Sequence, residues 1–407
     1  MKEVLHISDV VKANISGDWG EDSNIDNSLI EVACVRGADI NDVNGCNFKD
    51  IPIRYITKTS LANKCIQAGD IIIEKSGGAP NQSTGRVAYI SRECKEAHSK
   101  LVCSNFCEAF SVKSDWDSKY IFYYLQFIYN AGAFFNFEGK TSGIRNLDVE
   151  QAFRAIPIKK LDIELQRKAA EVLTSIDKKI ALNNRISADF ESLARLIYNY
   201  WFVQFDFPDA NGKPYKSAGG KMVYNEKLKR EIPEGWEVKK IEDILGRVKT
   251  TPKLVTDEYL ENGKYPIIDQ TVDVYFAGFT DREEAVVQQY PVVVFGDHSC
   301  AVKYVDFPFV RGADGTQILI SNDKRISTEY LYFAVQDVKM IEGYARHFSF
   351  LKESLIIVPE QSVATAFKDM AQNWFKSITQ HRFESLSLTR QRDELLPLLM
   401  NGQVTVE

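Results

Sequence analysis

The stretch that decides the fold occurs twice in the 407 residues, first as Ser118-Lys119-Tyr120-Ile121-Phe122-Tyr123 and again as Thr328-Glu329-Tyr330-Leu331-Tyr332-Phe333. The second copy lies 210 positions after the first. Two further matches keep the same order: residues 3–10 return at 237–244, 234 positions later, and a helical stretch from Gln166 returns at Gln361, 195 positions later. Because the order is kept while the offset shrinks, we interpret the chain as a duplication of one domain-sized unit.

The composition is typical of a folded globular protein, with 44% hydrophobic and 26% charged residues. No apolar run approaches the roughly 18 residues of a membrane span, and the first residues lack the apolar core of a signal peptide. We therefore expect a cytoplasmic protein with no membrane partner. The net charge of −6 does not by itself suggest a nucleic-acid ligand, so cations that bind DNA would have to gather on one face.

The cysteines predict reduced thiols. There are seven, an odd number, and only Cys300 lies in the second half of the chain. Cys94, His98, Cys103 and Cys107 are a conceivable set of zinc ligands. However, the set has no Cys-x-x-Cys pair, and its last two members lie in an apolar, strand-like run, so we favour buried thiols and expect no metal.

Changes of pattern divide the chain into five segments. Residues 1–157 and 232–356 consist of short β-branched and aromatic runs separated by Gly, Asn, Ser and Asp, which predicts two β-rich domains, the first with a helix at Tyr120–Tyr129. Residues 158–205 and 357–407 have helical periodicity, and the polar, glycine-containing segment 206–231 reads as a surface linker. The predicted fold class is α+β, with a pseudo-two-fold internal repeat.

Seam residues recur at steps of three and four in both helical segments. In the first they are Ala169, Val172, Ile176, Ile180, Asn183, Ile186, Phe190, Leu193, Ile197 and Trp201; in the second they are Ala364, Phe367, Ala371, Phe375, Ile378, His381, Ser385, Leu388, Arg392 and Leu396. Two such seams are most simply buried against each other, which predicts an antiparallel coiled coil with Asn183 setting the register. A straight helix from Gln166 to Trp201 would be about 54 Å long. Pro397 should kink or end the second helix, and Asn401-Gly402 supplies a stop.

Three motifs resemble one known family. They are Ile232-Pro233-Glu234-Gly235-Trp236-Glu237-Val238 at the start of the second β-rich domain, Asn183-Asn184-Arg185-Ile186 with Tyr200-Trp201-Phe202-Val203-Gln204-Phe205 on the first helix, and the end Arg392-Asp393-Glu394-Leu395-Leu396-Pro397-Leu398-Leu399-Met400-Asn401-Gly402. In this order they resemble the DNA specificity subunits of type I restriction-modification systems.

The resemblance implies that each β-rich domain is a target recognition domain that reads one half of a bipartite double-stranded DNA target. It implies that the two conserved helices set the spacing of the halves and dock two methyltransferase subunits, which restriction/translocase subunits then join. It also implies a non-catalytic chain without a cofactor, with S-adenosylmethionine, Mg²⁺ and ATP on the partner subunits.

The catalytic motifs that the chain lacks favour a reader over a catalyst. Neither Asp206-Phe207-Pro208 nor Asp306-Phe307-Pro308 matches the Asn/Asp-Pro-Pro-aromatic motif of an amino-methyltransferase, and no Gly-x-x-x-x-Gly-Lys-Ser/Thr loop is present. Asp209 and Glu237 could hold Mg²⁺ in a nuclease, but Glu237 belongs to the repeated domain opening. A self-sufficient DNA nuclease and a duplicated scaffold for proteins or glycans are the alternatives.

Loops that combine a flexible backbone with donor side chains are the candidate DNA contacts; the alternative is that they are solvated turns. In the first domain these loops are residues 75–86, where Gln82 could read adenine, and residues 139–146. In the second domain the loop after the valine strand, residues 296–303, corresponds to the first of them. The candidates are Lys75, Ser76, Gln82, Thr84, Arg86, Lys140, Thr141, Ser142 and Arg145 in the first domain, and His298, Ser299, Lys303, Arg311, Gln317, Arg346 and His347 in the second.

Overall fold

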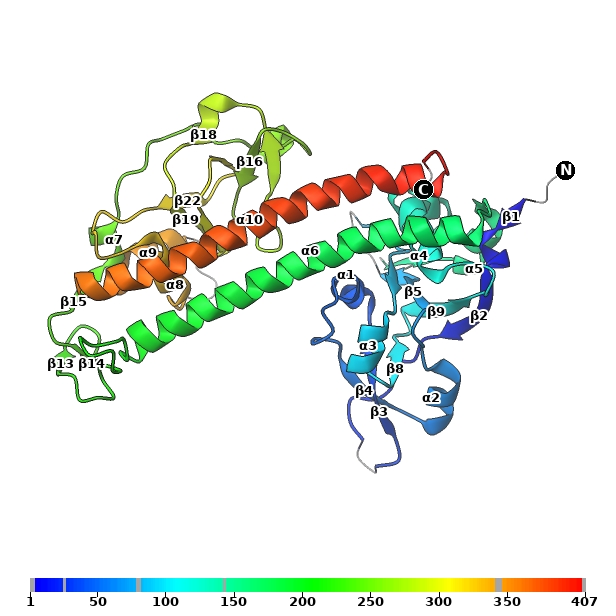
Figure 1. Cartoon of the computed structure of the whole chain (residues 1–407), viewed down its shortest axis with the longest axis horizontal. Coiled ribbons are helices and arrows are strands. Elements are labelled where there is room, and N and C mark those ends of the chain that lie inside the picture. The colour runs from blue at the N-terminus through cyan, green and yellow to red at the C-terminus, as the bar shows by residue number, and fades with distance from the viewer. Residues whose placement is uncertain (1–3, 25–26, 78–81, 142–143, 341–345, 405–407) are drawn as a thin grey trace. The chain divides into compact units, whose positions relative to one another are not determined.

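A computed structural model describes residues 4–24, 27–77, 82–141, 144–340 and 346–404 and divides the chain into two compact units (Figure 1). Unit 1 comprises Met1–Asn183 with Glu384–Glu407, and unit 2 comprises Asn184–Phe383. Each unit contains one β-rich head and parts of two long helices, so the predicted α+β fold with an internal repeat is confirmed.

Two long helices each contribute to both units. They are α6, Ile163–Tyr198, which continues as a π-helical turn over Asn199–Val203, and α10, Gln361–Met400. In unit 1 the start of α6 shares a core with the end of α10, where Leu173 and Leu396 are buried together. In unit 2 the end of α6 packs on the start of α10, and the rings of Tyr198 and Phe367 lie 6.2 Å apart. Within each unit the two helices therefore run antiparallel, as predicted.

Polar residues in the seam find partners across it. Asn183 is fully buried, and its side-chain amide donates to Glu384 Oε2 at 2.8 Å. Arg392 forms an ion pair with Asp177 at 3.0 Å. Both contacts lie in unit 1, and they give partners to the Asn183 amide N–H and the Arg392 guanidinium in an otherwise apolar stripe. The prediction that Asn183 is a buried polar position is confirmed.

Two details of the helices differ from the prediction. Leu193 is 39% exposed, while the neighbouring Ala194 is fully buried. The buried face of α6 has shifted by one residue there, because steps of three and four drift around a helix of 3.6 residues per turn. Pro397 does not end α10, which continues to Met400 before Gly402 adopts a left-handed conformation with φ of 67°.

The head of unit 1, called head 1, begins with a strand that pairs antiparallel with the strand just before α6. Its elements in chain order are β1 Leu5–His6, a 3-10 helix Ile7–Asp9, β2 Val11–Ser16, β3 Ile30–Val35, a 3-10 helix Gly37–Asp39, α1 Ile40–Asn44, β4 Ile53–Ile56, α2 Lys58–Lys64, β5 Ile71–Glu74, β6 Ser76–Gly77, β7 Val87–Tyr89, α3 Arg92–Ala97, β8 Leu101–Cys103, β9 Cys107–Val112, α4 Ser118–Asn130, a 3-10 helix Ala133–Phe137, β10 Glu138–Thr141, β11 Ile144–Leu147, α5 Val149–Ala155 and β12 Pro157–Ile158.

In unit 2, α6 is followed by a hairpin of β13 Met222–Asn225 and β14 Arg230–Pro233, which begins inside the segment that the sequence indicated as a linker and ends two residues beyond it. Head 2 follows, and its first strand β15 pairs antiparallel with its last strand β23, as β1 does with β12. The elements are β13 Met222–Asn225, β14 Arg230–Pro233, β15 Glu237–Lys240, α7 Ile241–Ile244, a 3-10 helix Thr256–Glu258, β16 Tyr265–Ile268, β17 Gly278–Thr280, a 3-10 helix Glu283–Ala285, β18 Val286–Val287, β19 Val292–Gly296, β20 Val302–Val305, β21 Phe309–Arg311, β22 Thr316–Leu319, α8 Thr328–Gln336, α9 His347–Glu353 and β23 Leu355–Val358.

The two heads share the strand pairing at the centre of two sheets, although β2 and the β6-β11-β10 sheet of head 1 and β18 of head 2 belong to one head each. In head 1, β5 lies between β7 and β9, both antiparallel to it; in head 2, β19 lies between β20 and β22 in the same way. A second sheet has a central strand with one antiparallel and one parallel neighbour, β3 with β4 and β8 in head 1 and β16 with β17 and β21 in head 2. The repeat seen in the sequence therefore extends to the pairing of strands.

Local sequence explains the repeated elements. The central strands contain Ile71–Ile73 and Val292–Val294, β-branched runs that are buried on both faces. The repeated helices α4 and α8 begin after Asp117 and Ser327, whose side chains accept a hydrogen bond from the backbone N–H three residues later. These caps fix where each helix starts, and the helix covers the sheet that precedes it.

The thiols considered as zinc ligands lie in the apolar interior of head 1. Cys94, Cys103 and Cys107 belong to one buried cluster, and burial raises the pKa of Cys94 to about 11 and that of Cys107 to about 12. The His98 ring nitrogen lies 2.8 Å from the Phe48 carbonyl oxygen.

No helix in the described part of the chain is long and apolar enough to cross a membrane.

Candidate nucleic-acid interface

Head 1 brings its two candidate loops together. Strand β6, which starts the first loop, pairs with β11, which ends the second, and Ser76 Oγ donates to Asn146 Oδ1 at 2.6 Å. The Lys75 backbone is held on both sides, because its N–H donates to Phe106 and its carbonyl accepts from Leu147. Lys140 and Thr141 lie on β10, opposite Arg145 and Ile144 of β11, and Ser142 lies outside the described residues.

Several candidates in head 1 are engaged inside the fold. Thr84 is fully buried, and its N–H and hydroxyl donate to Glu138 Oε1 at 2.7 and 2.9 Å. Arg145 lies 3.4 Å from the other oxygen of Glu138. Arg86 donates twice to Glu74, which raises the pKa of Arg86, and once to the Gly37 carbonyl. Thr84 and Arg86 therefore hold the loop in place, while Lys75 and Gln82 keep half-buried side chains.

One glycine in this loop has a steric reason. Gly85 has a φ of 102°, and a Cβ atom there would lie 2.6 Å from Phe134 Cδ2. Any side chain at this position would meet both a left-handed backbone and a collision with the core. The path of the loop between Gln82 and Arg86 is thus fixed by the packing of Phe134.

In head 2, Gln270 connects the turn after β19 to another turn. Its Oε1 accepts from the His298 N–H at 3.1 Å, and its Nε2 donates to the Asp314 carbonyl at 3.0 Å. Ser299 Oγ donates to the backbone carbonyl of Gln270 at 2.5 Å. His298 and Ser299 are exposed on this turn. The sequence reasoning missed Gln270, because nothing but this three-dimensional arrangement distinguishes it from an ordinary surface glutamine.

The same turn also holds the start of α9. Asp297 accepts from the Phe348 N–H through its Oδ1 at 2.7 Å, and its carbonyl accepts from the His347 N–H at 3.3 Å. Arg346, which is exposed, immediately precedes these two bonded residues, while His347 is buried. Each head therefore joins the loop after its central buried strand to the segment before its last short helix.

Two candidates in head 2 point inward. Lys303 is 7% exposed, and its ammonium donates to the Val274 carbonyl at 2.7 Å; burial lowers its pKa. Arg311 donates to the Thr251 carbonyl at 3.3 Å, and burial lowers its pKa as well. Lys303 lies within β20 rather than in the turn before it, so strand alternation turns its side chain into the head. Gln317 is half-buried on the edge strand β22.

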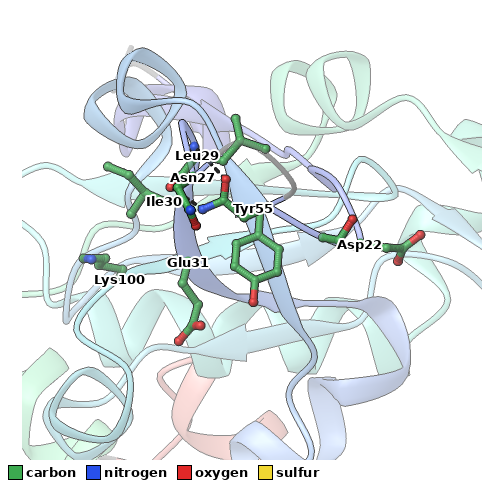
Figure 2. Close-up of a pocket in the computed structure, with 9 residues that line it drawn as sticks. Asp22, Asn27, Leu29, Ile30, Glu31, Tyr55 and Lys100 are labelled. Atoms are coloured by element: carbon green, nitrogen blue, oxygen red, sulfur yellow. Dashed lines mark hydrogen bonds between the residues drawn. The ribbon is translucent and has the colours of Figure 1, made fainter.

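An open hollow of about 580 Å³ on head 1 has a different character (Figure 2). Asn24 shapes one wall through two hydrogen bonds with the Leu29 backbone. The lining includes Asp22, Glu31, Tyr55 and Lys100. Because the carboxylates of Asp22 and Glu31 would repel phosphate, we place the candidate interface at the loops described above rather than here.

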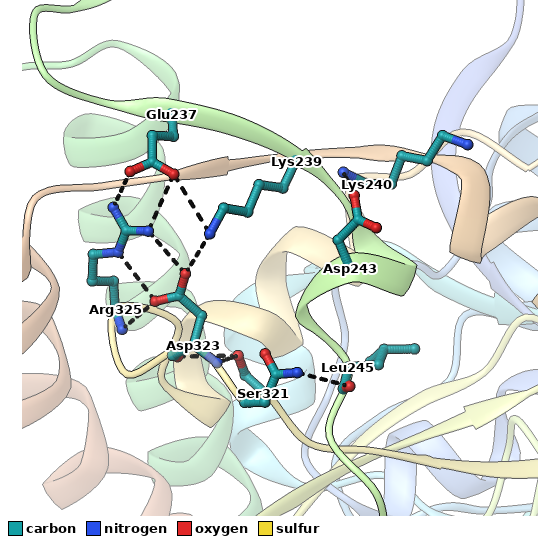
Figure 3. Close-up of polar contacts among 9 residues, drawn as sticks. Glu237, Lys239, Lys240, Asp243, Leu245, Ser321, Asp323 and Arg325 are labelled. Carbon is teal, nitrogen blue, oxygen red and sulfur yellow. Dashed lines mark hydrogen bonds and ion pairs between the residues drawn. The ribbon is translucent and has the colours of Figure 1, made fainter.

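An ion-pair network joins the start of β15 to the loop between β22 and α8 (Figure 3). Arg325 lies 2.8 Å from Glu237 and 2.9 Å from Asp323, and Lys239 lies 2.9 Å from Asp323. The hydrogen bond from Arg325 lowers the pKa of Glu237. Glu237, which was considered as a magnesium ligand, thus forms ion pairs with cations of the same head. The network fits a structural role, because it fixes the loop between β22 and α8.

Comparison with known proteins matches the chain in two segments, which correspond to its two copies. The type I restriction modification DNA specificity domain matches residues 3–192 and 233–387. The MjaIX type I restriction enzyme specificity subunit of Methanocaldococcus jannaschii is 26% identical over 60% of this chain and 60% of its own length, and the HindI type I restriction enzyme specificity subunit of Haemophilus influenzae is 24% identical over 60% and 68%.

The fold also has a solved counterpart. The crystal structure of a type I restriction-modification S subunit from M. genitalium is similar over 98% of this chain and 97% of that chain, with a TM-score of 0.57 and 15% identity. At this identity the likeness concerns the fold alone, whereas the domain match covers most of the sequence in two copies. The chain belongs to the type I restriction-modification DNA specificity family.

Proposed function

We propose that this chain is the non-catalytic DNA-recognition subunit of a type I restriction-modification complex, and that each head reads one half of a bipartite target. The observation that carries the proposal is the common construction of the heads. Each joins the loop after its central buried strand to the segment before its last short helix. Two copies of one site suit a double-stranded target with two halves, and membership of the family supports DNA as the ligand.

The proposal assigns DNA contact to candidates whose side chains remain accessible at these loops. They are Lys75, Gln82, His298, Ser299 and Arg346. Thr84, Arg86, Lys303 and Arg311, whose donors are directed to acceptors inside the heads, instead position the loops. Positioning matters for recognition, because base readout requires donors and acceptors held at fixed places against the base edges.

A further part of the proposal is that the end of α6, together with the π-helical turn that follows it, docks a methyltransferase subunit. Its support is a row of exposed apolar side chains at steps of three and four, which places them on one face of the helix. The row comprises Leu193, Leu196, Tyr200 and Val203, which are 39%, 62%, 38% and 42% exposed. S-adenosylmethionine, Mg²⁺ and ATP would then be bound by methyltransferase and restriction/translocase subunits, not by this chain.

Exchange of one head tests the recognition role. Residues 1–157 are replaced by the corresponding head of a relative, and the reconstituted methyltransferase complex is used to select methylated duplexes from a random pool. We expect one half of the selected sequence to change and the other half to stay. If both halves changed together, or if no sequence were selected, the proposal of two independent readers would be wrong.

Substitution in the apolar row tests docking separately. Leu196→Asp should abolish co-purification with the methyltransferase subunit, because a charge would be buried in an apolar interface. Val223→Asp on β13 is the matched control, since Val223 is 45% exposed and lies outside the row. Equal co-purification of the two variants would remove the row from the interface.

A further inference from the structure

We infer that the basic segment Arg247–Lys253 of head 2 is a phosphate-binding flank of the second DNA-reading site, with no counterpart in head 1. This inference rests on the proposed function and adds to it a site for the DNA backbone. Residues 246–253 contain three cations, Arg247, Lys249 and Lys253, and no acidic residue. The corresponding residues of the first copy, 12–19, contain one cation and one acid, Lys12 and Asp18.

The fold of the two copies differs at the same place. In head 1 the corresponding residues lie largely within β2, an edge strand that pairs with β9 over most of its length. In head 2, residues 247–253 form no strand and no backbone–backbone hydrogen bond with another described residue, although the Thr251 carbonyl accepts from the Arg311 side chain. The second copy therefore differs from the first at this segment in two ways: it has no strand pairing and it contains two more cations.

Both ends of the segment are nevertheless anchored. At its start, Gly246 N–H donates to the Ile320 carbonyl at 2.8 Å, next to the loop that the ion-pair network holds (Figure 3). At its end, Leu254 is 1% exposed and exchanges backbone hydrogen bonds with Arg311 and Ala313. The segment therefore starts beside the residue that follows β22 and ends beside the turn that precedes it.

This position connects the segment to the turn after β19 of head 2, which carries His298 and Ser299. The turn before β22 carries Asp314, whose carbonyl accepts from Gln270, the residue that holds His298 and Ser299. Lys253 lies 3.9 Å from the carboxylate of Asp314. The cations thus flank the turns that carry the candidate base contacts, where a duplex bound to those turns would present its phosphates.

The charges of the segment are available to a ligand. Arg247 and Lys249 have exposed side chains, and neither forms an ion pair with another residue of the described ranges. Exposed cations on an irregular, anchored segment are the groups that contact phosphates in DNA complexes, where they add affinity without reading sequence. We therefore expect Arg247 and Lys249 to contribute about two phosphate contacts, with Lys253 mainly positioning the segment through Asp314.

The test measures how salt changes the affinity of the full-length chain for a fluorescent duplex between 50 and 200 mM salt. Each phosphate contact contributes about 0.9 to the slope of log affinity against log salt, so Arg247→Gln/Lys249→Gln should lower the slope by about 1.8. The charge-retaining variant Arg247→Lys should keep the parent slope. Lys216→Gln/Lys227→Gln makes the same change of charge at exposed positions before and within the β13–β14 hairpin and should also keep it.

The outcomes separate the inference from the proposed function. A parent chain that binds no duplex would overturn both. Salt-dependent binding by the parent with an unchanged slope in Arg247→Gln/Lys249→Gln would overturn the inference and leave the proposed function standing. An equal fall in the slope of the hairpin control would also overturn the inference, because overall charge and not this segment would then be responsible.

Discussion

Glu138 should be the residue on which the conformation of residues 75–86, the first candidate loop of head 1, depends most. Its side chain is 5% exposed, and it accepts both the N–H and the hydroxyl of Thr84, which is itself fully buried. Glu138→Ala removes the acceptor of two buried donors, and each such loss costs about 1–3 kcal/mol. We therefore expect the local structure around Thr84 to lose about 2–6 kcal/mol of stability.

Two further variants grade this effect. Glu138→Gln keeps a carbonyl oxygen for Thr84 but loses the charge, so it should cost only about 1–2 kcal/mol. Glu150→Ala is the matched control, because Glu150 is 73% exposed in an ion pair with Arg154 on α5 and should cost less than about 1 kcal/mol.

Native-state hydrogen exchange is the suitable assay, because the chain consists of two units and global unfolding would not isolate one loop. Since 1.4 kcal/mol corresponds to a factor of ten, amides at residues 82–90 should exchange at least about thirtyfold faster in Glu138→Ala. The same variant should bind DNA more weakly through head 1. Identical exchange rates in Glu138→Ala and Glu150→Ala would refute the reasoning.

Three other expectations concern spacing, contact type and pH. Four residues inserted after Asn183 should lengthen α6 by about 6 Å and increase the preferred spacer by one or two base pairs, measured as methylation of duplexes that differ only in spacer length; an unchanged spacer preference in a folded variant would contradict this role of α6. Lys75→Ala and Arg346→Ala should each weaken binding to all sequences and lower the slope of log affinity against log salt by about 0.9, the contribution of one phosphate contact. Titrations at several salt concentrations measure this slope, and an unaltered slope would show that neither residue contacts the DNA backbone. Hydrogen bonds from Arg325 lower the pKa of Asp323, so this carboxylate stabilises head 2 above the pKa of the unfolded chain, and the contribution is lost as pH falls below about 4. The unfolding free energy of unit 2 should therefore fall less between pH 6 and pH 3 in Asp323→Asn than in the parent. An equal fall in both proteins would contradict the stabilising role of the network.

The duplication made most of the fold predictable. Matched segments kept their order, so the pairing of Glu237–Lys240 with the strand before α10 could be expected once the same arrangement was assumed for the first copy. Long helices and fully buried strands carry strong periodic signals, and α4, α6 and α10 lie where the pattern placed them. Short, irregular elements carry no such signal, and most of the β13–β14 hairpin was accordingly interpreted as linker.

The candidate interface was only partly predictable, for a different reason. Sequence identifies donors in loops but not the direction in which each side chain points. Lys303 was assigned to a turn, yet it lies one residue inside β20 and faces the interior. Glu138 and Gln270 were missed because their roles arise from partners 54 and 28 residues away, and such pairings are a property of the folded chain.

The division of the chain into units has a consequence for the order in which the protein is made. Unit 2 is a single continuous stretch, Asn184–Phe383, so all of its residues have been synthesised before the chain is finished. Unit 1 needs Glu384–Glu407 as well, and Leu396, Leu399 and Met400 complete its core. Because domains fold as units during synthesis, head 1, which is translated first, completes its packing last. An mRNA truncated before the codon for residue 384 would therefore give a chain in which unit 2 is complete and unit 1 lacks part of its core.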